Sequence, residues 1–235
     1  MMKRGLGLVR AAMDPRFAHV TDWIFDLDNC LYPASSRLFE LIDERMGAYI
    51  QRLLGCDRAE ARRVQKAHFH EHGTTLAGLM RHNGVDPHDF LEDVHAIELD
   101  RLVPDDRLVR ALGRLPGRKI IFTNGDAPYA RRVLEALGLG GHFADLHDIH
   151  AAELRPKPDG HGYRLLIDRF AIDPTHALMV EDMAQNLKPA KALGMTTAWV
   201  DNGSERGNHG HHPDFVDYTI NDVGLWLDEI IGDDQ

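Results

Sequence analysis

The chain has few cysteines, no long hydrophobic run and a deficit of positive charge. The two cysteines, Cys30 and Cys56, are too few for a disulfide framework, and no Cys and His pattern has the spacing of a zinc site. No stretch is apolar for long enough to cross a bilayer, so we expect a cytoplasmic protein without membrane contact. The formal net charge of -10 argues against a nucleic acid polymer as a partner, because such binding depends on clustered Lys and Arg.

The remaining composition is that of a globular protein whose strands and helices alternate. A hydrophobic content of 43% over 235 residues allows one large domain or a core with a smaller insert. From Arg118 onward, short apolar runs alternate with helical patterns, which predicts the βαβ units of a parallel sheet and an α/β fold. The predicted strands are 119–122, 177–180 and 197–200, and the predicted helices between them are 129–137 and 187–193.

The segment between residues 35 and 115 has a different pattern. Apolar residues recur there at helical spacing, and no strand-like run intervenes. Several residues mark helix boundaries: Gly55 as an end, Asp57 with Glu60 as a capping pair, and Asp86-Pro87 as a start. This insert is therefore predicted to be helical throughout.

These patterns predict a Rossmann-like core that is interrupted by a helical cap. An acidic strand end, then helices, then the rest of a sheet describes a cap inserted over an active site. The expected parts are a loose leader (1–17), the core (18–34 and 116–235) and the cap (35–115).

The most informative segment is the acidic end of the first predicted strand. The apolar residues 23–25 run directly into Asp26 and Asp28, and Pro33 ends the segment. In an open parallel sheet, the carboxyl ends of the strands border the ligand crevice. Two carboxylates in one crevice repel each other unless a cation or a proton lies between them. The pattern therefore predicts a Mg2+ site for phosphoryl chemistry, with one carboxylate free to attack phosphorus.

Three later segments carry residues that suit the same chemistry. Thr123, Asn124 and Gly125 follow the second predicted strand, and their hydroxyl, amide and backbone groups can bind phosphate oxygens. Lys157 precedes a predicted helix, and Asp182 follows a later strand. Each alone has an ordinary explanation as a turn residue, a cap or a solvated charge. Their order at successive strand ends favours a single site.

In this order, the four motifs resemble those of the haloacid dehalogenase (HAD) superfamily. Its phosphatases carry Asp-x-Asp, then Ser or Thr, then Lys, then an acidic pair. The resemblance implies that Asp26 is the nucleophile, that Asp28 is the acid and base, and that Lys157 neutralises charge. The implied phosphate ligands are Thr123, Asn124, Gly125 and Lys157, and the implied Mg2+ site consists of Asp26, the main-chain carbonyl of Asp28 and Asp182, with Asn186 in the outer shell.

Within the superfamily, residues 26–33, 72–79 and 155–158 are similar to the pyrimidine 5′-nucleotidase-like branch. That resemblance implies a small phosphorylated metabolite as the partner, namely a nucleotide such as UMP or CMP, which is hydrolysed to nucleoside and phosphate. The candidate specificity residues in the cap are His72, Thr74 and Thr75, although capping of the next helix explains the threonines equally well.

Other functions remain open at this stage. A phosphatase for phosphoglycolate, a sugar phosphate or pyridoxal phosphate is the nearest alternative. A haloacid dehalogenase and a phosphoacceptor switch are disfavoured by Asp28, because a second acid has no use in halide displacement and would hasten loss of a stored phosphoryl group.

Two groups of residues lie outside this scheme. Cys30 occupies a position where the superfamily usually has Thr or Val, and we expect it to pack in the core. Of the cap histidines, only His68 and His72 share a helix side, and solvent exposure is the default expectation for them. The His-rich loop with His209, His211 and His212 could bind a transition metal, but its glycines and proline are typical of an ordinary loop.

Overall fold

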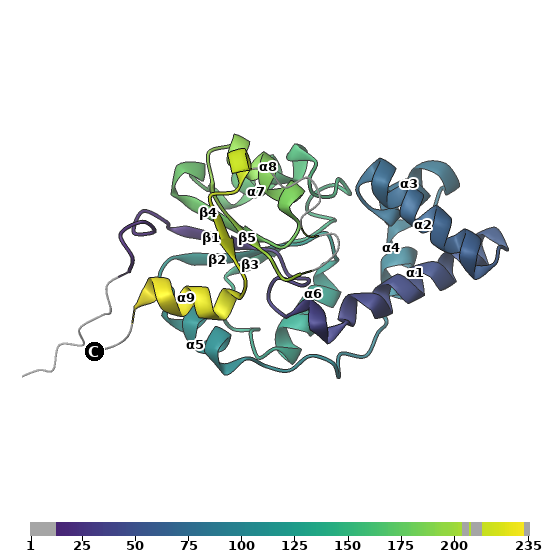
Figure 1. The fold of residues 1–235 in the computed structure, drawn as a ribbon. Helices are drawn as coiled ribbons and strands as arrows, with labels where there is room; N and C mark the ends of the chain where they lie inside the picture. Colours follow the sequence, from purple (N-terminus) through teal and green to yellow (C-terminus); the bar gives the residue numbers. More distant parts are fainter. Residues whose placement is uncertain (1–12, 204–206, 208–212, 233–235) are drawn as a thin grey trace, which may run out of the picture.

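A parallel sheet of six strands forms the centre of the molecule, in the order β3-β2-β1-β4-β5-β6 (Figure 1). The computed structural model describes residues 13–203, 207 and 213–232. The α/β fold with a Rossmann-like core is thus confirmed. The strands are β1 (Asp22–Phe25), β2 (Arg118–Phe122), β3 (Asp145–His147), β4 (Ala177–Glu181), β5 (Thr196–Val200) and β6 (Tyr218–Ile220).

The first strand lies between two strands that come much later in the chain. β1 pairs in parallel with β2 and with β4, so that Phe25 is opposite both Ile121 and Val180. The backbone continues this pairing for one more residue, because the Asp26 amide donates to the Val180 carbonyl at 2.9 Å. The carboxyl ends of three strands therefore meet at one edge of the sheet.

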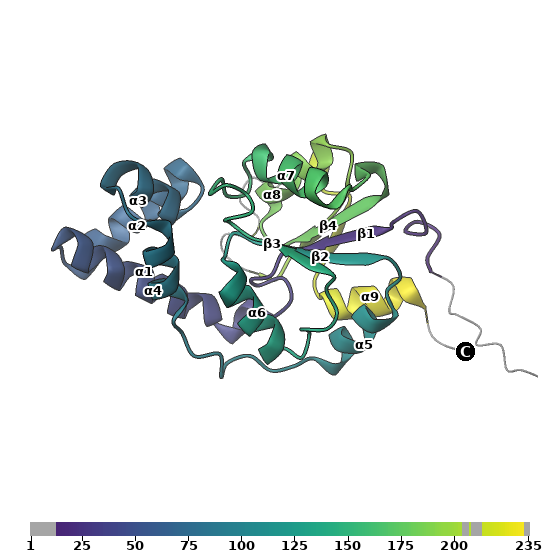
Figure 2. The same ribbon diagram turned by 180° about the vertical axis from the view of Figure 1, so that it is seen from behind.

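Helices cover both faces of the sheet. Alternate residues of β1 face opposite ways: Trp23 and Phe25 belong to one buried cluster, and Ile24 belongs to the other. The first cluster includes residues of α5, α6 and α9, and the second includes residues of α7 and α8, so these helices lie on opposite sides of the sheet (Figures 1 and 2). The bounds are α5 (Asp106–Arg114), α6 (Ala127–Ala136), α7 (Gly160–Phe170), α8 (Ala184–Ala192) and α9 (Val223–Ile231).

Four helices between β1 and α5 stand apart from the sheet, at one end of the molecule (Figure 1). Their boundaries follow the local signals: Gly55 ends the first helix with a φ of 63°, Asp57 accepts from the Glu60 amide at 2.9 Å, and Pro87 follows the N-cap Asp86. We call these four helices the cap. They are α1 (Leu38–Leu54), α2 (Arg58–His72), α3 (Thr75–Asn83) and α4 (Pro87–His95), and short 3-10 turns occur at Ala34–Ser36, Pro174–His176 and Pro213–Phe215.

Two segments pack differently from the predicted domain ranges. α5 falls within 35–115, yet it packs against α9 under the sheet, because its buried face carries Leu108, Ala111 and Leu112. Phe17 falls within the predicted leader, yet it is buried against the rings of Trp23, Tyr218 and Trp226. None of the helices in the described ranges combines the length and the apolar character that crossing a bilayer requires.

Candidate active site

A buried lysine joins two carboxylates at the carboxyl edge of the sheet. Lys157 Nζ donates to Asp26 Oδ1 at 2.7 Å, to Glu181 Oε2 at 2.6 Å and to the Phe122 carbonyl at 2.9 Å. Burial lowers the pKa of Lys157, but attraction to Asp26 and Glu181 outweighs burial and leaves this pKa raised. The ammonium group therefore stays charged, and it links the ends of β1, β2 and β4.

Three buried acids form a cluster around this lysine. Carboxylate oxygens of Asp26, Glu181 and Asp182 lie within 4.8 Å of one another. Burial, followed by repulsion from the neighbouring carboxylates, raises the pKa of Glu181 to about 7 and raises the pKa of Asp182. One lysine thus leaves negative charge uncompensated, and the donor set consists of oxygens only. These residues fit Mg2+, which prefers oxygen ligands.

A fourth polar group points to the same conclusion. Asn186 lies at the start of α8 and is buried, and its Oδ1 atom has no hydrogen-bond partner among the described residues. The residue also lines the cavity that contains the acidic cluster. An orphaned oxygen at this place suits a water molecule in the outer shell of a cation.

Asp28 is held by two tyrosine hydroxyls. Its Oδ1 accepts from Tyr32 at 2.6 Å and from Tyr129, at the start of α6, at 2.7 Å. Burial and the charge of Asp26 raise the pKa of Asp28, against the opposing effect of the two hydrogen bonds. Asp28 therefore favours its protonated form more than an exposed aspartate does, and its orientation is fixed.

The loop after β2 positions both a hydroxyl and the lysine. Thr123 is buried, and its Oγ1 accepts from the Gly125 amide at 3.0 Å. The Asn124 side chain donates to the Lys157 carbonyl at 3.2 Å and accepts from the Lys157 amide at 2.8 Å. Asn124 was expected to contact phosphate, but here its amide joins two loops and fixes the backbone that carries Lys157.

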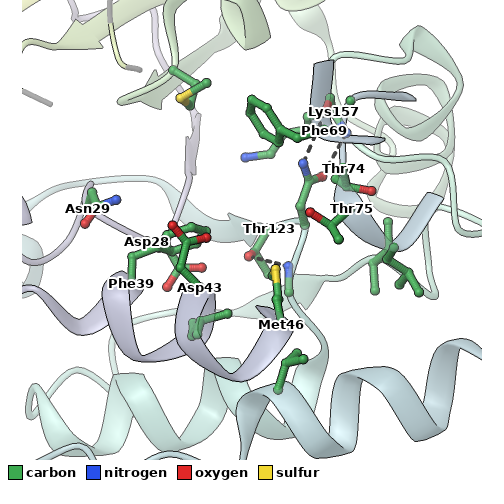
Figure 3. Close-up of a pocket in the computed structure, with 18 of the residues that line it drawn as sticks. Asp28, Asn29, Phe39, Asp43, Met46, Phe69, Thr74, Thr75, Thr123 and Lys157 are labelled. Carbon is green, nitrogen blue, oxygen red and sulfur yellow. Dashed lines mark hydrogen bonds between the residues drawn. The ribbon is translucent and has the colours of Figure 1, made fainter. Parts of the chain in front are cut away.

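The cap and the core enclose a cavity of about 630 Å³, which all five acidic and basic core residues Asp26, Asp28, Lys157, Glu181 and Asp182 line. Figure 3 shows core side chains such as Thr123 and cap side chains such as Phe69 around this cavity. The remaining predicted phosphate-binding residues, Thr123, Asn124 and Gly125, line it as well.

The predicted specificity residues divide into two groups. Thr74 and Thr75 line the cavity, but the Thr74 hydroxyl also caps α3 by accepting from the Ala77 amide at 3.1 Å. His72 does not line the cavity, because its ring faces His82 on α3. Its neighbour His70 lines the cavity instead.

A chain of contacts leads from the cap to Asp28. His95, the last residue of α4, donates to Asp126 at 3.0 Å, and its ring stacks on Tyr129 at 4.2 Å between centroids. Burial raises the pKa of Asp126, but the hydrogen bond and charge of His95 outweigh burial and lower it overall. The same Tyr129 donates to Asp28, so one ring touches both the cap and the acid.

Sequence reasoning missed Tyr32, Tyr129, His95 and the pairing of Glu181 with Lys157. Tyr32 and Glu181 stand inside motifs that were recognised, so their proximity was a usable signal. Tyr129 and His95 reach the site only through tertiary packing, and the local sequence contains no sign of it.

Cys30 packs as expected. Its side chain is buried, and burial raises the pKa of the thiol well above the usual range, which makes the thiolate scarce. The His-rich loop with His209, His211 and His212 lies outside the described residues.

The parallel sheet, the inserted cap and the acidic edge with its lysine define the class of the protein. The family model of haloacid dehalogenase-like hydrolases matches residues 24–194, which is more than half of the chain. The protein therefore belongs to the haloacid dehalogenase-like hydrolase family, and the resemblance at superfamily level is confirmed.

Individual relatives are more distant. Phosphate metabolism protein 8 of Saccharomyces cerevisiae is 25% identical over 190 residues, which cover 74% of this chain and only 59% of that protein. The crystal structure of a HAD phosphatase from Thermococcus onnurineus has a TM-score of 0.63 and 20% identity, covering 91% of this chain and 98% of that one.

The fold is equally close to enzymes of another activity. The structure of L-2-haloacid dehalogenase from Xanthobacter autotrophicus with covalently bound chloropropionic acid has a TM-score of 0.56 and 18% identity, covering 91% of this chain and 99% of that one. Similarity at this level shows the fold alone, so the reaction has to be argued from the site.

Proposed function

We propose that this protein is a Mg2+-dependent phosphomonoesterase that acts through an aspartyl-phosphate on Asp26. The observation that carries the proposal is the pair of acids on one strand end. Asp26 is fixed by Lys157, and Asp28, with its raised pKa, is fixed by Tyr32 and Tyr129. One carboxylate is thus held ionised beside a cation, while the other is suited to carry a proton.

In the first step, an Asp26 carboxylate oxygen attacks phosphorus and the bond to the ester oxygen breaks. Asp28 donates its proton to the leaving oxygen, and the alcohol departs. In the second step, Asp28 takes a proton from water, whose oxygen attacks phosphorus and releases Asp26. Mg2+, held by Asp26, the Asp28 carbonyl and Asp182, supplies charge neutralisation of the phosphoryl oxygens.

The other residues of the site bind and screen the phosphoryl group. The Thr123 hydroxyl and the backbone amides of the loop at Asn124 and Gly125 are placed to bind its oxygens. Lys157 neutralises charge beside the reacting oxygen of Asp26. Glu181, which was left out of the metal set on sequence grounds, holds this lysine from the other side.

A dehalogenase shares this fold but has no need for a proton donor at position 28. Two tyrosines that orient Asp28 support acid and base chemistry on an alcohol leaving group. The two activities differ in their need for the divalent cation: EDTA is expected to abolish phosphate release and to leave halide release untouched. A stored phosphoryl group, as in a switch, would give no multiple turnover.

For the substrate, we propose a pyrimidine nucleoside 5′-monophosphate such as UMP or CMP. A cavity of about 630 Å³ accommodates a base and a sugar beside the phosphate, whereas phosphoglycolate would fill a small part of it. The aromatic rings of Phe39, Phe69 and Phe90 line the cavity and can pack against a base, and Thr75 adds a hydroxyl. Sugar phosphates and pyridoxal phosphate are the alternatives of similar size.

The test is a panel of phosphate esters with Mg2+, read as phosphate release. UMP and CMP are expected to give the highest kcat/KM among nucleotides, phosphoglycolate, sugar phosphates and pyridoxal phosphate. Asp26→Asn is expected to abolish turnover, because the amide is nearly isosteric and a poor nucleophile. The matched control is Asp100→Asn, an exposed acid outside the cavity. Turnover by pure Asp26→Asn would refute the proposed nucleophile, and a different winner in the panel would refute only the substrate.

A further inference from the structure

Three histidines of the cap gather outside the substrate cavity. His68 and His72 are four positions apart on α2, so they share one face of that helix, and His82 lies near the end of α3. The Nε2 atoms of His72 and His82 are 2.8 Å apart, and one nitrogen from each of the three rings lies within 4.8 Å of the others. We call these residues the histidine cluster.

The backbone of α3 is shaped to admit the cluster. His68 lies directly over Gly78, where an added Cβ atom would come within 2.3 Å of the His68 ring. The glycine thus lets α2 and α3 approach, and the rings of His68 and His82 stack with 5.4 Å between their centroids. Both helices pack closely along this face.

From this arrangement we propose that His68, His72 and His82 form a binding site for a transition-metal cation of the Zn2+ type, and that the ion ties α2 to α3. Imidazole nitrogen is a preferred ligand of Zn2+, Cu2+ and Ni2+, and three such ligands leave a fourth position open. With Zn–N bonds of about 2.0–2.1 Å, the nitrogens around one ion are about 3.4 Å apart, so the observed separations need only small rotations of the rings.

The electrostatics of the cluster favour a cation shared by neutral rings. Burial, followed by the proximity of His82 and His72, lowers the pKa of His68, so its lone pair is available near neutral pH. Glu71 lies 3.6 Å from His72 Nε2 and adds one negative charge at the rim. A nitrogen site of this kind is chemically distinct from the oxygen cluster around Lys157, because Mg2+ prefers oxygen ligands.

The position of the cluster gives the ion a structural consequence. The turn between α2 and α3 begins at Gly73, next to His72, and it lies against the loop of Lys157: a Cβ atom on Gly73 would be 3.8 Å from Pro156 and 3.9 Å from the Lys157 carbonyl. A bound ion would therefore fasten the two helices whose turn meets the core, and it would stabilise the cap without contacting the phosphate.

The experiment is Zn2+ titration by calorimetry of the full-length, tag-free protein in excess Mg2+, which saturates the oxygen cluster. The parent carries His209, His211 and His212→Ala, so that the His-rich loop contributes no ligand. We expect about one equivalent of Zn2+ in this parent and a loss of affinity of about tenfold or more in His72→Ala and in His82→Ala. His88→Ala is the matched control, because His88 stacks on His150 outside the cluster and its removal is expected to leave the affinity unchanged.

Two further measurements keep the test independent of the folding of the variants. Co2+ added to the parent is expected to give the strong visible absorption of a four-coordinate site, and Zn2+ is expected to raise the melting temperature of the parent but not of His72→Ala. Equal Zn2+ affinity in the parent and in His72→Ala would overturn the proposal. So would a parent that binds no Zn2+, or one whose Co2+ spectrum shows only weak octahedral bands.

Discussion

At the scale of single residues, the least expected feature is the pair of tyrosines on Asp28. Tyr32 and Tyr129 both donate to the same carboxylate oxygen, which leaves the other oxygen, Oδ2, free of these two bonds. An acid and base needs a fixed direction for its proton as well as a suitable pKa. The two hydroxyls supply that direction, and Tyr129 is itself held by the stacked ring of His95.

We expect Tyr129→Phe to lower kcat by about tenfold or more and to change KM little. The variant keeps the ring that packs under His95 and removes only the hydrogen bond to Asp28, and a hydrogen bond to a charged group contributes about 1.5–3 kcal/mol. The measurement is steady-state phosphate release from the best substrate of the panel.

The matched control for this variant is Tyr49→Phe. Tyr49 packs edge-on against Phe90 in the cap and does not line the cavity. Equal kcat values for Tyr129→Phe and Tyr49→Phe would show that the bond to Asp28 does not contribute to the reaction.

At the scale of elements, local signals in the sequence were enough wherever a helix or strand is long or carries its own boundary. Gly138 and Gly194 follow α6 and α8 with positive φ, as their positions after leucine predict. β3 and β6 were missed because each has only three residues and lies toward an edge of the sheet, where few residues need to be apolar. α5 was assigned to the cap because its helical pattern does not reveal which neighbour it packs against.

The candidate site divides in the same way. Asp26, Asp28, Thr123, Lys157 and Asp182 stand at strand ends and loops, and the parallel topology alone brings them together. The side-chain uses of Asn124 and His72 depend on rotamers and on a second loop or helix, which no local pattern encodes. Sequence therefore predicted the edge on which the site is built, and packing decided which atoms are left available.

The α2–α3 turn yields a prediction about an element boundary. Thr74→Ala removes the hydroxyl that accepts from the Ala77 amide, and loss of such a cap destabilises a helix by about 1 kcal/mol. We expect a lower free energy of unfolding in chemical denaturation, while Thr74→Ser restores it. If Thr74→Ala left stability unchanged, the hydroxyl would be free to act on substrate.

At the scale of the whole molecule, one buried histidine makes folding sensitive to acid. His147, at the end of β3, is fully buried beside the rings of Phe122 and Phe170. Burial, aided by the charge of Arg169, lowers the pKa of His147 to about 4. In the unfolded chain its pKa returns to about 6.5, so the unfolded state binds a proton between these values while the folded state does not.

Stability is therefore expected to fall as the pH drops from about 6.5 towards 4, and His147 alone contributes a loss of about 2 kcal/mol between pH 7 and pH 5. The measurement is the free energy of unfolding by denaturant at these two pH values. His147→Leu is expected to lose less stability over this range than the parent by that amount. The control is His19→Leu, an exposed histidine, and the same pH dependence in all three proteins would contradict the assignment.

The central place of β1 also affects how the chain is made. Translation produces Asp26 early, but the strands on either side of β1 begin only at Arg118 and Ala177. A nascent chain that has emerged as far as the cap therefore carries the nucleophile on a strand with both edges open, and open edges are templates for pairing with other chains. Because Lys157, Glu181 and Asp182 are synthesised last among the site residues, a ribosome must deliver most of the protein before any catalytic edge exists.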